Sequence, residues 1–217
     1  TALKKDGIYA KSYSGSLLFE PHISVKEDGT PYRVFTPFFR KGCLSRFPQP
    51  ERPCGTPREI VYYNQKGITL SKLSLKPKVK WYDSLAKAWN PGEDGAHQRL
   101  EEFLKGGIVN YKTGRNIPSG KNVSRLSPHL HFGEISPNEI ANRLGDIDNE
   151  DKERFYTELV WREFSHNLLF FNPKLDTTNL QEKFNAFPWL KNKAYLDAWQ
   201  TGKTGYPIID AGMRELW

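Results

Sequence analysis

A carboxylate, an indole and a guanidinium recur at helical spacing near the middle of the chain. Glu158, Trp161 and Arg162 stand at positions i, i+3 and i+4, with Ser165 at i+7, so a helix would place all four on one face. Such a stripe can read a base, because the indole stacks, the carboxylate accepts from N–H groups and the arginine pairs with phosphate. The pattern equally fits a solvated face with a Glu158–Arg162 ion pair and a surface tryptophan.

The segment 122–128, NVSRLSP, is a second candidate site. Its two serines and several backbone N–H groups converge on a predicted helix N-terminus, which suits a phosphate or pyrophosphate. The segment is not a glycine-rich dinucleotide fingerprint, so it does not indicate a Rossmann fold. The alternative is structural: Ser127 caps the helix and Pro128 takes its first position.

Trp189 and Trp199 are candidates for the core, where most large aromatic side chains lie. Near a flavin, a tryptophan could instead act as an oxidisable relay. No metal site is expected, because the five histidines share no ligand spacing and Cys43 and Cys54 form no CxxC pair. We expect both thiols to be free in a reducing compartment.

Helical patterns dominate from about residue 96 onward. The longest predicted helix runs from about 152 to 171, where Asn172 and Pro173 end it. Ser136–Glu139 has the sequence of a capping box that starts a shorter helix, which comes before the long one in the chain. A last helix begins near Pro207. Five apolar residues would fill much of the remaining circumference of the long helix: Leu159, Val160, Phe164, Leu168 and Phe171.

The N-terminal part reads differently. A helix end, a break at Gly7 and a strand at Ser16–Phe19 are predicted, which together are too little for a domain. Residues 23–95 are rich in proline and glycine, and a loop of this length needs an explanation. Its aromatic residues favour a packed connector, because disordered segments are poor in them: Tyr32, Phe35, Phe38, Phe39, Tyr62, Tyr63 and Trp81.

The composition indicates a globular protein that favours polyanions. The 217 residues carry a net charge of +7, with a pI near 9.3, and 13% are aromatic. The chain has no apolar run of about 18 residues and no visible signal peptide, so we expect no membrane span. It begins with Thr1 and stops at Trp217, and we expect it to be a piece of a longer protein.

Four motifs in one order resemble the photolyase/cryptochrome family. SRLSPHLHFGEISP at 124–137 resembles the family's flavin-phosphate segment, and ELVWREF at 158–164 its substrate-facing helix. WQTGKTGYPIIDAGMR at 199–214 is similar to the block that follows, and YRVFTPF at 32–38 to the interdomain connector. The resemblance covers nearly the whole chain and is strongest to bacterial enzymes that repair cyclobutane pyrimidine dimers.

The resemblance implies a mainly α fold, with the first part of a helical domain that holds FAD in a U-shaped conformation. It implies three domain ranges: the end of an α/β antenna domain at 1–22, a connector at 23–95 and the truncated FAD-binding domain at 96–217. The implied FAD contacts are Tyr111, Val123, Ser124, Arg125, Leu126 and Ser127. The implied DNA contacts are Arg115, Glu158, Trp161, Arg162 and Ser165, of which Glu158 and Trp161 are catalytic. Trp189 would be the surface end of the electron-transfer relay.

Two departures from the family pattern bear on cofactors. Val123 replaces a common threonine, which removes a hydroxyl donor and weakens phosphate binding by about one neutral hydrogen bond. Residues 175–177 lack the lysine of folate-binding relatives, which argues against a folate antenna. A second chromophore, of folate or deazaflavin type, would belong to the missing N-terminal domain. The resemblance also places half of the FAD pocket beyond Trp217, so we expect weak or no FAD binding from these residues alone.

Three functions follow as hypotheses. The first is a deoxyribodipyrimidine photo-lyase, which flips a dimer out of damaged DNA and splits it with an electron from excited reduced FAD. The second is a cryptochrome photoreceptor, which the basic charge and the Glu158/Trp161 pair make the weaker reading. The third is an inactive fragment. The enzyme is expected to be a monomer in the bacterial cytoplasm, without membrane contact.

Overall fold

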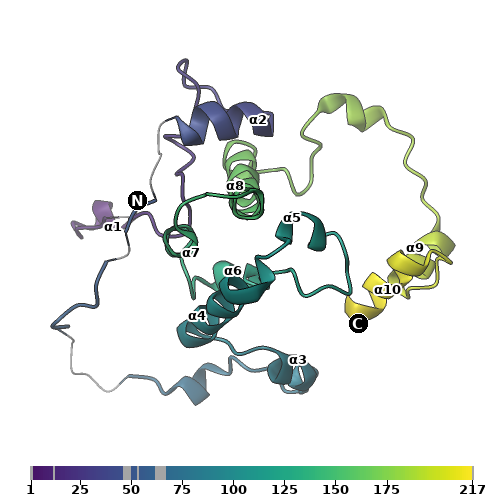
Figure 1. The fold of residues 1–217 in the computed structure, drawn as a ribbon, viewed down its shortest axis with the longest axis horizontal. Helices are drawn as coiled ribbons and strands as arrows, with labels where there is room; N and C mark the ends of the chain where they lie inside the picture. The colour runs from purple at the N-terminus through teal and green to yellow at the C-terminus, as the bar shows by residue number, and fades with distance from the viewer. Residues whose placement is uncertain (1, 12, 46–49, 53, 62–66, 217) are drawn as a thin grey trace. The chain divides into compact units, whose positions relative to one another are not determined.

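The computed structural model describes residues 2–11, 13–45, 50–52, 54–61 and 67–216. Every regular element in these ranges is helical and none is a strand, although Val25 and Pro31 form one isolated antiparallel bridge (Figure 1). The predicted mainly α class is therefore confirmed.

The helices are short except for one. Before the long helix, the elements are α1 (Ala2–Lys5), α2 (Phe35–Pro37), the π-helix η1 (Phe38–Leu44), the 3-10 helix η2 (Leu70–Leu73), α3 (Asp83–Ala88), α4 (Glu93–Glu102), the π-helix η3 (Phe103–Gly107), α5 (Tyr111–Gly114), α6 (Ser127–Phe132) and α7 (Pro137–Leu144). The long helix α8 (Glu150–Phe171) is followed by the 3-10 helix η4 (Glu182–Ala186), α9 (Lys193–Gln200) and α10 (Pro207–Leu216).

The chain divides into two compact units, residues 1–171 and residues 172–217. The boundary falls at the end of α8, where Asn172 and Pro173 stop the helix as the sequence predicts. The predicted domain boundaries at 22 and 95 stay predictions.

The core of the first unit is built on α8, which packs against α5 and α7. Most of the apolar residues in the middle of α8 are buried, as the helical pattern predicts, and join one cluster with residues of α4, η3, α5 and α7, whereas Leu169 and Phe170 near its end are exposed. Leu159, Val160 and Phe164 lie in this cluster. Such burial, at about 25 cal/mol per Å² of apolar surface, is the main stabilising contribution to a fold of this size.

The predicted cap of α7 is confirmed on one side only. The hydroxyl of Ser136 accepts from the N–H of Glu139 at 3.0 Å, with Pro137 at the first helical position. The reciprocal contact of a capping box is not made by Glu139. Its carboxylate instead lies 3.4 Å from Nδ1 of His97 on α4, which links the two helices.

The strand predicted at Ser16–Phe19 is wrong. The N–H groups of Leu18 and Phe19 both donate to the carboxylate of Glu163 on α8, at 2.8 and 3.2 Å. The carbonyl of Ser16 accepts from Arg162 at 2.9 Å. Side chains of one helix therefore satisfy backbone groups that a strand would offer to a neighbouring strand. Upstream, α1 and the break at Gly7, whose φ is +74°, are as predicted.

The predicted packed connector is confirmed for its first part only. Tyr32 and Phe38 are buried in the core, and Phe35 and Phe39 pack against it. Trp81 is exposed, as are nearly all described residues of 51–87, so this stretch is not packed. Tyr62 and Tyr63 lie outside the described residues.

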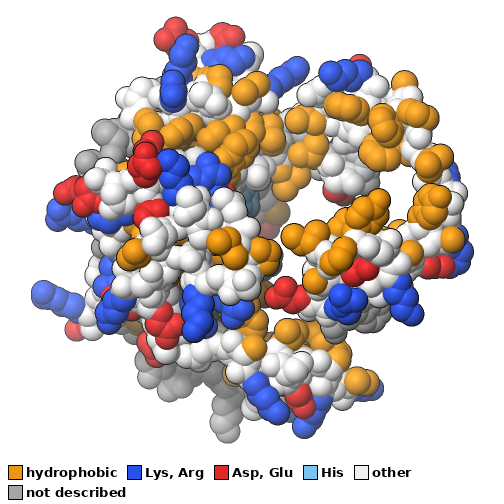
Figure 2. Space-filling model, turned by 45° about the vertical axis from the view of Figure 1, so that its right-hand side comes forward, with side chains coloured by type: hydrophobic (Ala, Val, Ile, Leu, Met, Phe, Trp, Pro, Cys, Tyr) orange, Lys and Arg blue, Asp and Glu red, His pale blue; other side chains and the backbone are white. Residues whose placement is uncertain are grey.

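The second unit has little core of its own. Helices α9 and α10 pack on each other, and the carboxylate of Asp210 closes the loop between them by accepting from Thr204 N, Thr204 Oγ1 and Gly205 N at 2.7, 2.6 and 3.0 Å. Core positions predicted for Trp189 and Trp199 are wrong, because both side chains are exposed. Figure 2 shows how widely hydrophobic side chains occur on the visible surface.

Throughout the part of the chain that the structure describes, every helix is too short or too polar to cross a bilayer.

Candidate functional site

One cavity collects most of the residues that the sequence singles out. It has a volume of about 390 Å³, and we call it the α8 pocket because one side of α8 forms its wall. Its lining comprises Tyr111, Val123, Ser124, Arg125, Leu126, Ser127, Leu130, Phe155, Glu158, Leu159 and Arg162. All six predicted FAD contacts are in this lining, together with two of the five predicted DNA contacts.

Tyr111 enters the pocket from α5, whose position depends on α8. The carboxylate of Asp151 accepts from the N–H groups of Asn110 and Lys112, at 2.9 and 2.8 Å, and so ties the start of α5 to the first turn of α8. Asn110 takes a left-handed conformation, with φ +60°, to make this turn. The Tyr111 ring then packs edge-on against Phe155, and burial raises the pKa of its phenol.

Asn122 anchors the start of the loop 123–127 by hydrogen bonds from its side chain. Its amide donates to the carbonyls of Gly107 and Val109, at 3.2 and 2.7 Å, and its side chain lies so close to Gly114 that a Cβ there would clash with it. Within the loop, Arg125 has φ +53° and Leu126 is buried. The guanidinium of Arg125 lies 6.0 Å from the centre of the Trp89 ring, at the end of the connector.

The structural reading of Ser127 as an N-cap is wrong. Leu126 occupies the N-cap position of α6, and Ser127 is the first helical residue, with Pro128 next. No side-chain hydrogen bond caps this helix in the structure. The hydroxyl of Ser127 is therefore exposed on the pocket wall instead of being used by its own helix.

Glu158 is held by two guanidinium groups. Arg154, one turn earlier on α8, contacts Oε1 at 2.7 Å, and Arg115 forms a short hydrogen bond to the same oxygen. The second oxygen, Oε2, has no partner within the described residues. If this side of α8 were an ordinary solvated face, Glu158 would pair with Arg162. This ion pair does not form, because Glu158 pairs with Arg115 and Arg154 instead.

Arg162 turns toward the N-terminal segment. Its Nη1 donates to the Ser16 carbonyl at 2.9 Å and to Oε1 of Glu163 at 3.1 Å, while the side chain still lines the pocket. Glu163 is 1% exposed and was not among the predicted residues. Burial raises its pKa to about 7, against the opposing influence of the Phe19 N–H, Arg162 and the Leu18 N–H.

Trp161 and Ser165 lie on the same side of α8 but do not line the pocket. The Trp161 side chain is 40% exposed, and one of its faces is stacked on Phe35 of the connector. The Ser165 hydroxyl donates to the Trp161 carbonyl at 3.0 Å, an ordinary contact within a helix. The predicted four-residue stripe is therefore divided into a pocket pair, Glu158 and Arg162, and an outer pair.

Trp189 belongs to the second unit, where its ring contacts Phe187 at 4.6 Å and is 68% exposed. This exposure agrees with the surface position that the resemblance implies, and its role in electron transfer stays a prediction.

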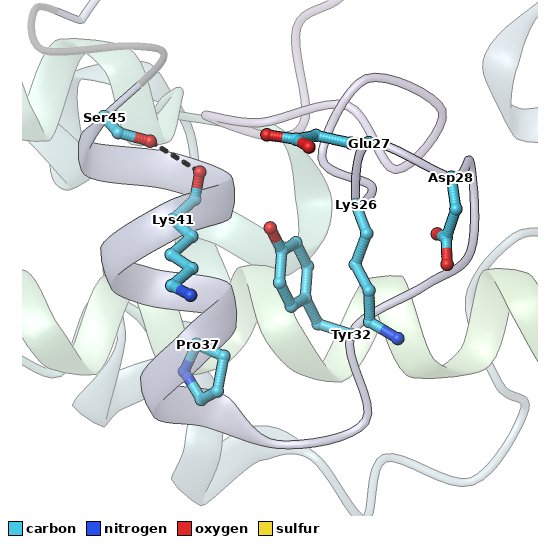
Figure 3. A pocket seen from close by; sticks show the side chains of 7 residues that line it. All are labelled: Lys26, Glu27, Asp28, Tyr32, Pro37, Lys41 and Ser45. Carbon is cyan, nitrogen blue, oxygen red and sulfur yellow. Dashed lines mark hydrogen bonds between the residues drawn. The ribbon is translucent and has the colours of Figure 1, made fainter.

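A second, more open hollow of about 720 Å³ lies at the connector (Figure 3). It surrounds the Tyr32 ring, with Lys26, Glu27 and Asp28 on one side and Pro37, Lys41 and Ser45 on the other. None of the predicted site residues lines it. Nowhere in the described ranges do three histidine, cysteine, aspartate or glutamate side chains gather as a metal site requires.

Three residues that shape the site were not predicted as site residues from the sequence: Arg154, Glu163 and Phe35. A signal existed for Arg154, which precedes Glu158 by one helical turn, the spacing of an ion pair. Glu163 carries no such signal, because a glutamate in a helix normally faces solvent. Phe35 acts across 126 residues of sequence, a pairing that one sequence does not reveal.

Comparisons with known proteins identify the family of the chain. Residues 155–217 match the family model described as the FAD binding domain of DNA photolyase. The deoxyribodipyrimidine photo-lyase of Agrobacterium fabrum is 40% identical, over 99% of this chain and 46% of that protein. The chain belongs to the photolyase/cryptochrome family.

Solved structures of the family superpose on the chain. The crystal structure of a bacterial class III photolyase from Agrobacterium tumefaciens gives a TM-score of 0.89 at 40% identity, covering 100% of this chain and 46% of the other.

Among the sequence relatives, Cryptochrome-1 of Arabidopsis thaliana is 34% identical, over 99% of the chain and 33% of that protein. The chain thus spans about half the length of the curated photolyases that it matches.

The α8 pocket fits part of the family's cofactor. Its volume of about 390 Å³ lies within the range of small-molecule sites, about 300–1,000 Å³. Arg125 and the two serine hydroxyls suit phosphate oxygens, whereas Leu126, Leu159 and the Tyr111 ring suit the flat apolar faces of a flavin or adenine.

The raised pKa of Glu163 predicts a pH-dependent stability. The folded chain binds this proton more tightly than the unfolded chain, so the free energy of unfolding falls as pH rises from about 4.5 to about 7. Relative to Glu163→Gln, the wild type should lose up to about 3 kcal/mol over this interval. Urea unfolding at pH 5, 6, 7 and 7.5 measures the difference.

The matched control is Glu153→Gln, an exposed glutamate on the same helix, which should follow the wild type at every pH. Parallel stability curves for the wild type and Glu163→Gln would contradict the assignment.

Proposed function

We propose that the protein binds FAD and uses near-ultraviolet or blue light to split pyrimidine dimers in DNA. The observation that carries this proposal is the α8 pocket, where the predicted flavin contacts meet Glu158 and Arg162 in one cavity. The relatives named photo-lyase supply the reaction, that of a carbon–carbon lyase.

Residues on two sides of the pocket would hold FAD. Arg125, with Ser124 and Ser127, would bind the phosphates, and Tyr111 and Leu126 would pack against the rings. When bound and reduced, FAD would supply, on excitation by light, the electron that opens the cyclobutane ring, and that electron would return to the flavin once the two pyrimidines have separated. The buried apolar lining of Phe155 and Leu159 would keep water from this region.

Glu158 and Trp161 would recognise the lesion. Arg115 and Arg154 both bind Oε1 of Glu158, which leaves Oε2 to accept from an imide N–H of a flipped pyrimidine. Trp161 would stack on the flipped bases through its accessible surface. In this arrangement Arg115 orients the carboxylate, and Arg162 orients the N-terminal segment through the Ser16 carbonyl.

We propose the partner, the oligomeric state and the location of the protein from its net charge and its family. A net charge of +7 favours the phosphate backbone of damaged DNA, and the protein would act as a monomer in the bacterial cytoplasm. A second, light-harvesting chromophore would bind outside these 217 residues. The exposed Trp189 would be the surface end of the relay that reduces FAD.

A cryptochrome-type photoreceptor is the second candidate, favoured by the 34% identity to Cryptochrome-1. The deciding experiment incubates the full-length protein, with reduced FAD, and a duplex carrying one thymine dimer under blue light. Light-dependent loss of the dimer supports the repair enzyme. Flavin photoreduction without loss of the dimer would overturn the repair proposal in favour of the photoreceptor.

Val123→Thr should strengthen FAD binding. The side chain lines the pocket and is nearly half exposed, so the new hydroxyl can donate to a phosphate oxygen. One neutral hydrogen bond contributes about 0.5–1.5 kcal/mol, so the Kd should fall by up to about tenfold. Flavin fluorescence titration of the full-length protein measures the change. Val61→Thr, the same substitution on the exposed connector, should change nothing, and equal affinity of both variants would refute the role of position 123.

Glu158→Ala should lower the number of dimers split per absorbed photon. The substitution removes a charged acceptor, and one hydrogen bond to a charged group contributes about 1.5–3 kcal/mol, so a decrease of roughly ten- to 150-fold is expected. Repair is followed by the recovery of thymine absorbance under calibrated light. Glu158→Gln, which keeps an acceptor, should retain more activity than the alanine variant; an unchanged yield in Glu158→Ala at equal flavin content would remove Glu158 from the reaction.

Trp161→Ala should weaken binding to dimer-containing DNA by roughly 1–3 kcal/mol, the contribution of stacking one base on an aromatic side chain. Affinity for the same duplex without a dimer should stay the same, because phosphate contacts dominate there. Fluorescence anisotropy in the dark measures both. Trp81→Ala, an exposed tryptophan of the connector, serves as the control, and an unchanged dimer affinity in Trp161→Ala would contradict the stacking role.

A further inference from the structure

The ring of Phe35 lies flat against the indole of Trp161. Their centroids are 3.6 Å apart and their planes differ by 7°, and Phe39 stacks behind Phe35 at 5.7 Å and 12°. We call these three near-parallel rings, Phe39, Phe35 and Trp161, the ring ladder. Its first two rings come from the connector and its last from α8, so the ladder joins the connector to the proposed lesion-reading side chain.

A fourth ring holds the ladder from its edge. Phe164, one turn after Trp161 on α8, meets both Phe35 and Trp161 edge-on, at 5.9 Å and 74° in each case. The indole is thus restrained on one face and along one edge, a geometry that aromatic pairs favour. A tryptophan has only two side-chain torsions, and these contacts restrict both. Phe35 covers one face of the indole, and Trp161 as a residue stays 40% exposed.

The backbone under Phe35 is itself anchored. Phe38 is fully buried, and its ring lies 5.2 Å from that of Phe164. Tyr32 packs edge-on against Phe38 at 6.3 Å and lies beside the helix that carries Pro37 and Lys41 (Figure 3). The missing side chain of Gly42 leaves the Tyr32 ring room there. A Cβ at Gly42 would be 2.9 Å from Cε2 of Tyr32. Phe35 therefore sits on a segment that is pinned at both ends, as a rigid support requires.

We propose that Phe35 is a positioning residue for lesion recognition: it fixes the Trp161 indole so that one face is presented to a flipped pyrimidine dimer. The inference rests on the proposed function of Trp161 and goes beyond it, because it assigns a role in dimer binding to the connector. A ring ordered before binding loses less conformational entropy when the dimer stacks on it, so the free protein is already shaped for the ligand.

The test compares Phe35→Leu with the wild type in the full-length protein with FAD. Leucine keeps an apolar side chain of similar bulk but removes the flat ring. The Kd for a duplex with one thymine dimer should rise about three- to tenfold, the range of a single aromatic pair, while the Kd for the undamaged duplex stays within about twofold. In a Trp161→Ala background, Phe35→Leu should have no further effect, because its only route to the dimer is through the indole.

Two variants and one spectrum separate positioning from folding. Phe35→Tyr should restore dimer affinity because it restores the ring, and Phe170→Leu, the same change at an exposed ring near the end of α8, should match the wild type. With 5-fluorotryptophan, the ¹⁹F resonance assigned by Trp161→Phe should shift in Phe35→Leu, whereas the melting temperature and flavin content should not change beyond those of Phe170→Leu.

Other results would contradict either the positioning role of Phe35 or the proposed function of the protein. Equal loss of affinity for damaged and undamaged duplex, or an unchanged dimer affinity with a shifted Trp161 resonance, would overturn the positioning role alone. Tighter dimer binding in Phe35→Leu would also overturn it, because the ring would then compete with a base for the indole. A wild type without preference for the dimer would overturn the proposed function itself, and the positioning role with it.

Discussion

The buried carboxylate of Glu163 is the interaction on which the first unit depends. A helix such as α8, apolar around much of its circumference, can bury more than one side, and packing alone would leave its rotation weakly defined. Glu163 removes this freedom, because a buried carboxyl group needs partners and finds them in the N–H groups of Leu18 and Phe19 and in Arg162. The rotation of α8 that satisfies Glu163 also directs Glu158 into the α8 pocket.

The same interaction explains why residues 16–19 are irregular. Backbone groups that would pair within a sheet are instead bound by α8, and the segment is held without a neighbouring strand. The N-terminal tail, the connector and the α8 pocket thus meet consecutive turns of α8. Glu163 binds the tail, Trp161 and Phe164 bind the connector, and Glu158 faces the pocket.

Hydrogen bonds and ion pairs within the protein order the site before a ligand binds. Asp151 orders the start of α5 and so places Tyr111, and Asn122 holds the loop that carries the other proposed flavin contacts. Arg115 and Arg154 share one oxygen of Glu158, which settles the orientation of its carboxylate before any ligand arrives. Such order in the free protein lowers the entropy lost on binding, the general advantage of a preorganised site.

Local and periodic features of this protein follow from its sequence. The length of α8, its end before Asn172 and Pro173, the Ser136 cap and the stripe of Glu158, Trp161 and Arg162 depend on contacts within a few residues. The four motifs in family order give the flavin contacts that we propose. Only the tertiary structure decided the partners. Glu158 pairs with Arg115 instead of Arg162, Glu163 is buried, Trp161 stacks on Phe35, and Trp189 and Trp199 are exposed. These outcomes depend on contacts between segments far apart in the chain, or on burial that periodicity does not report, and a single sequence carries no local signal for either.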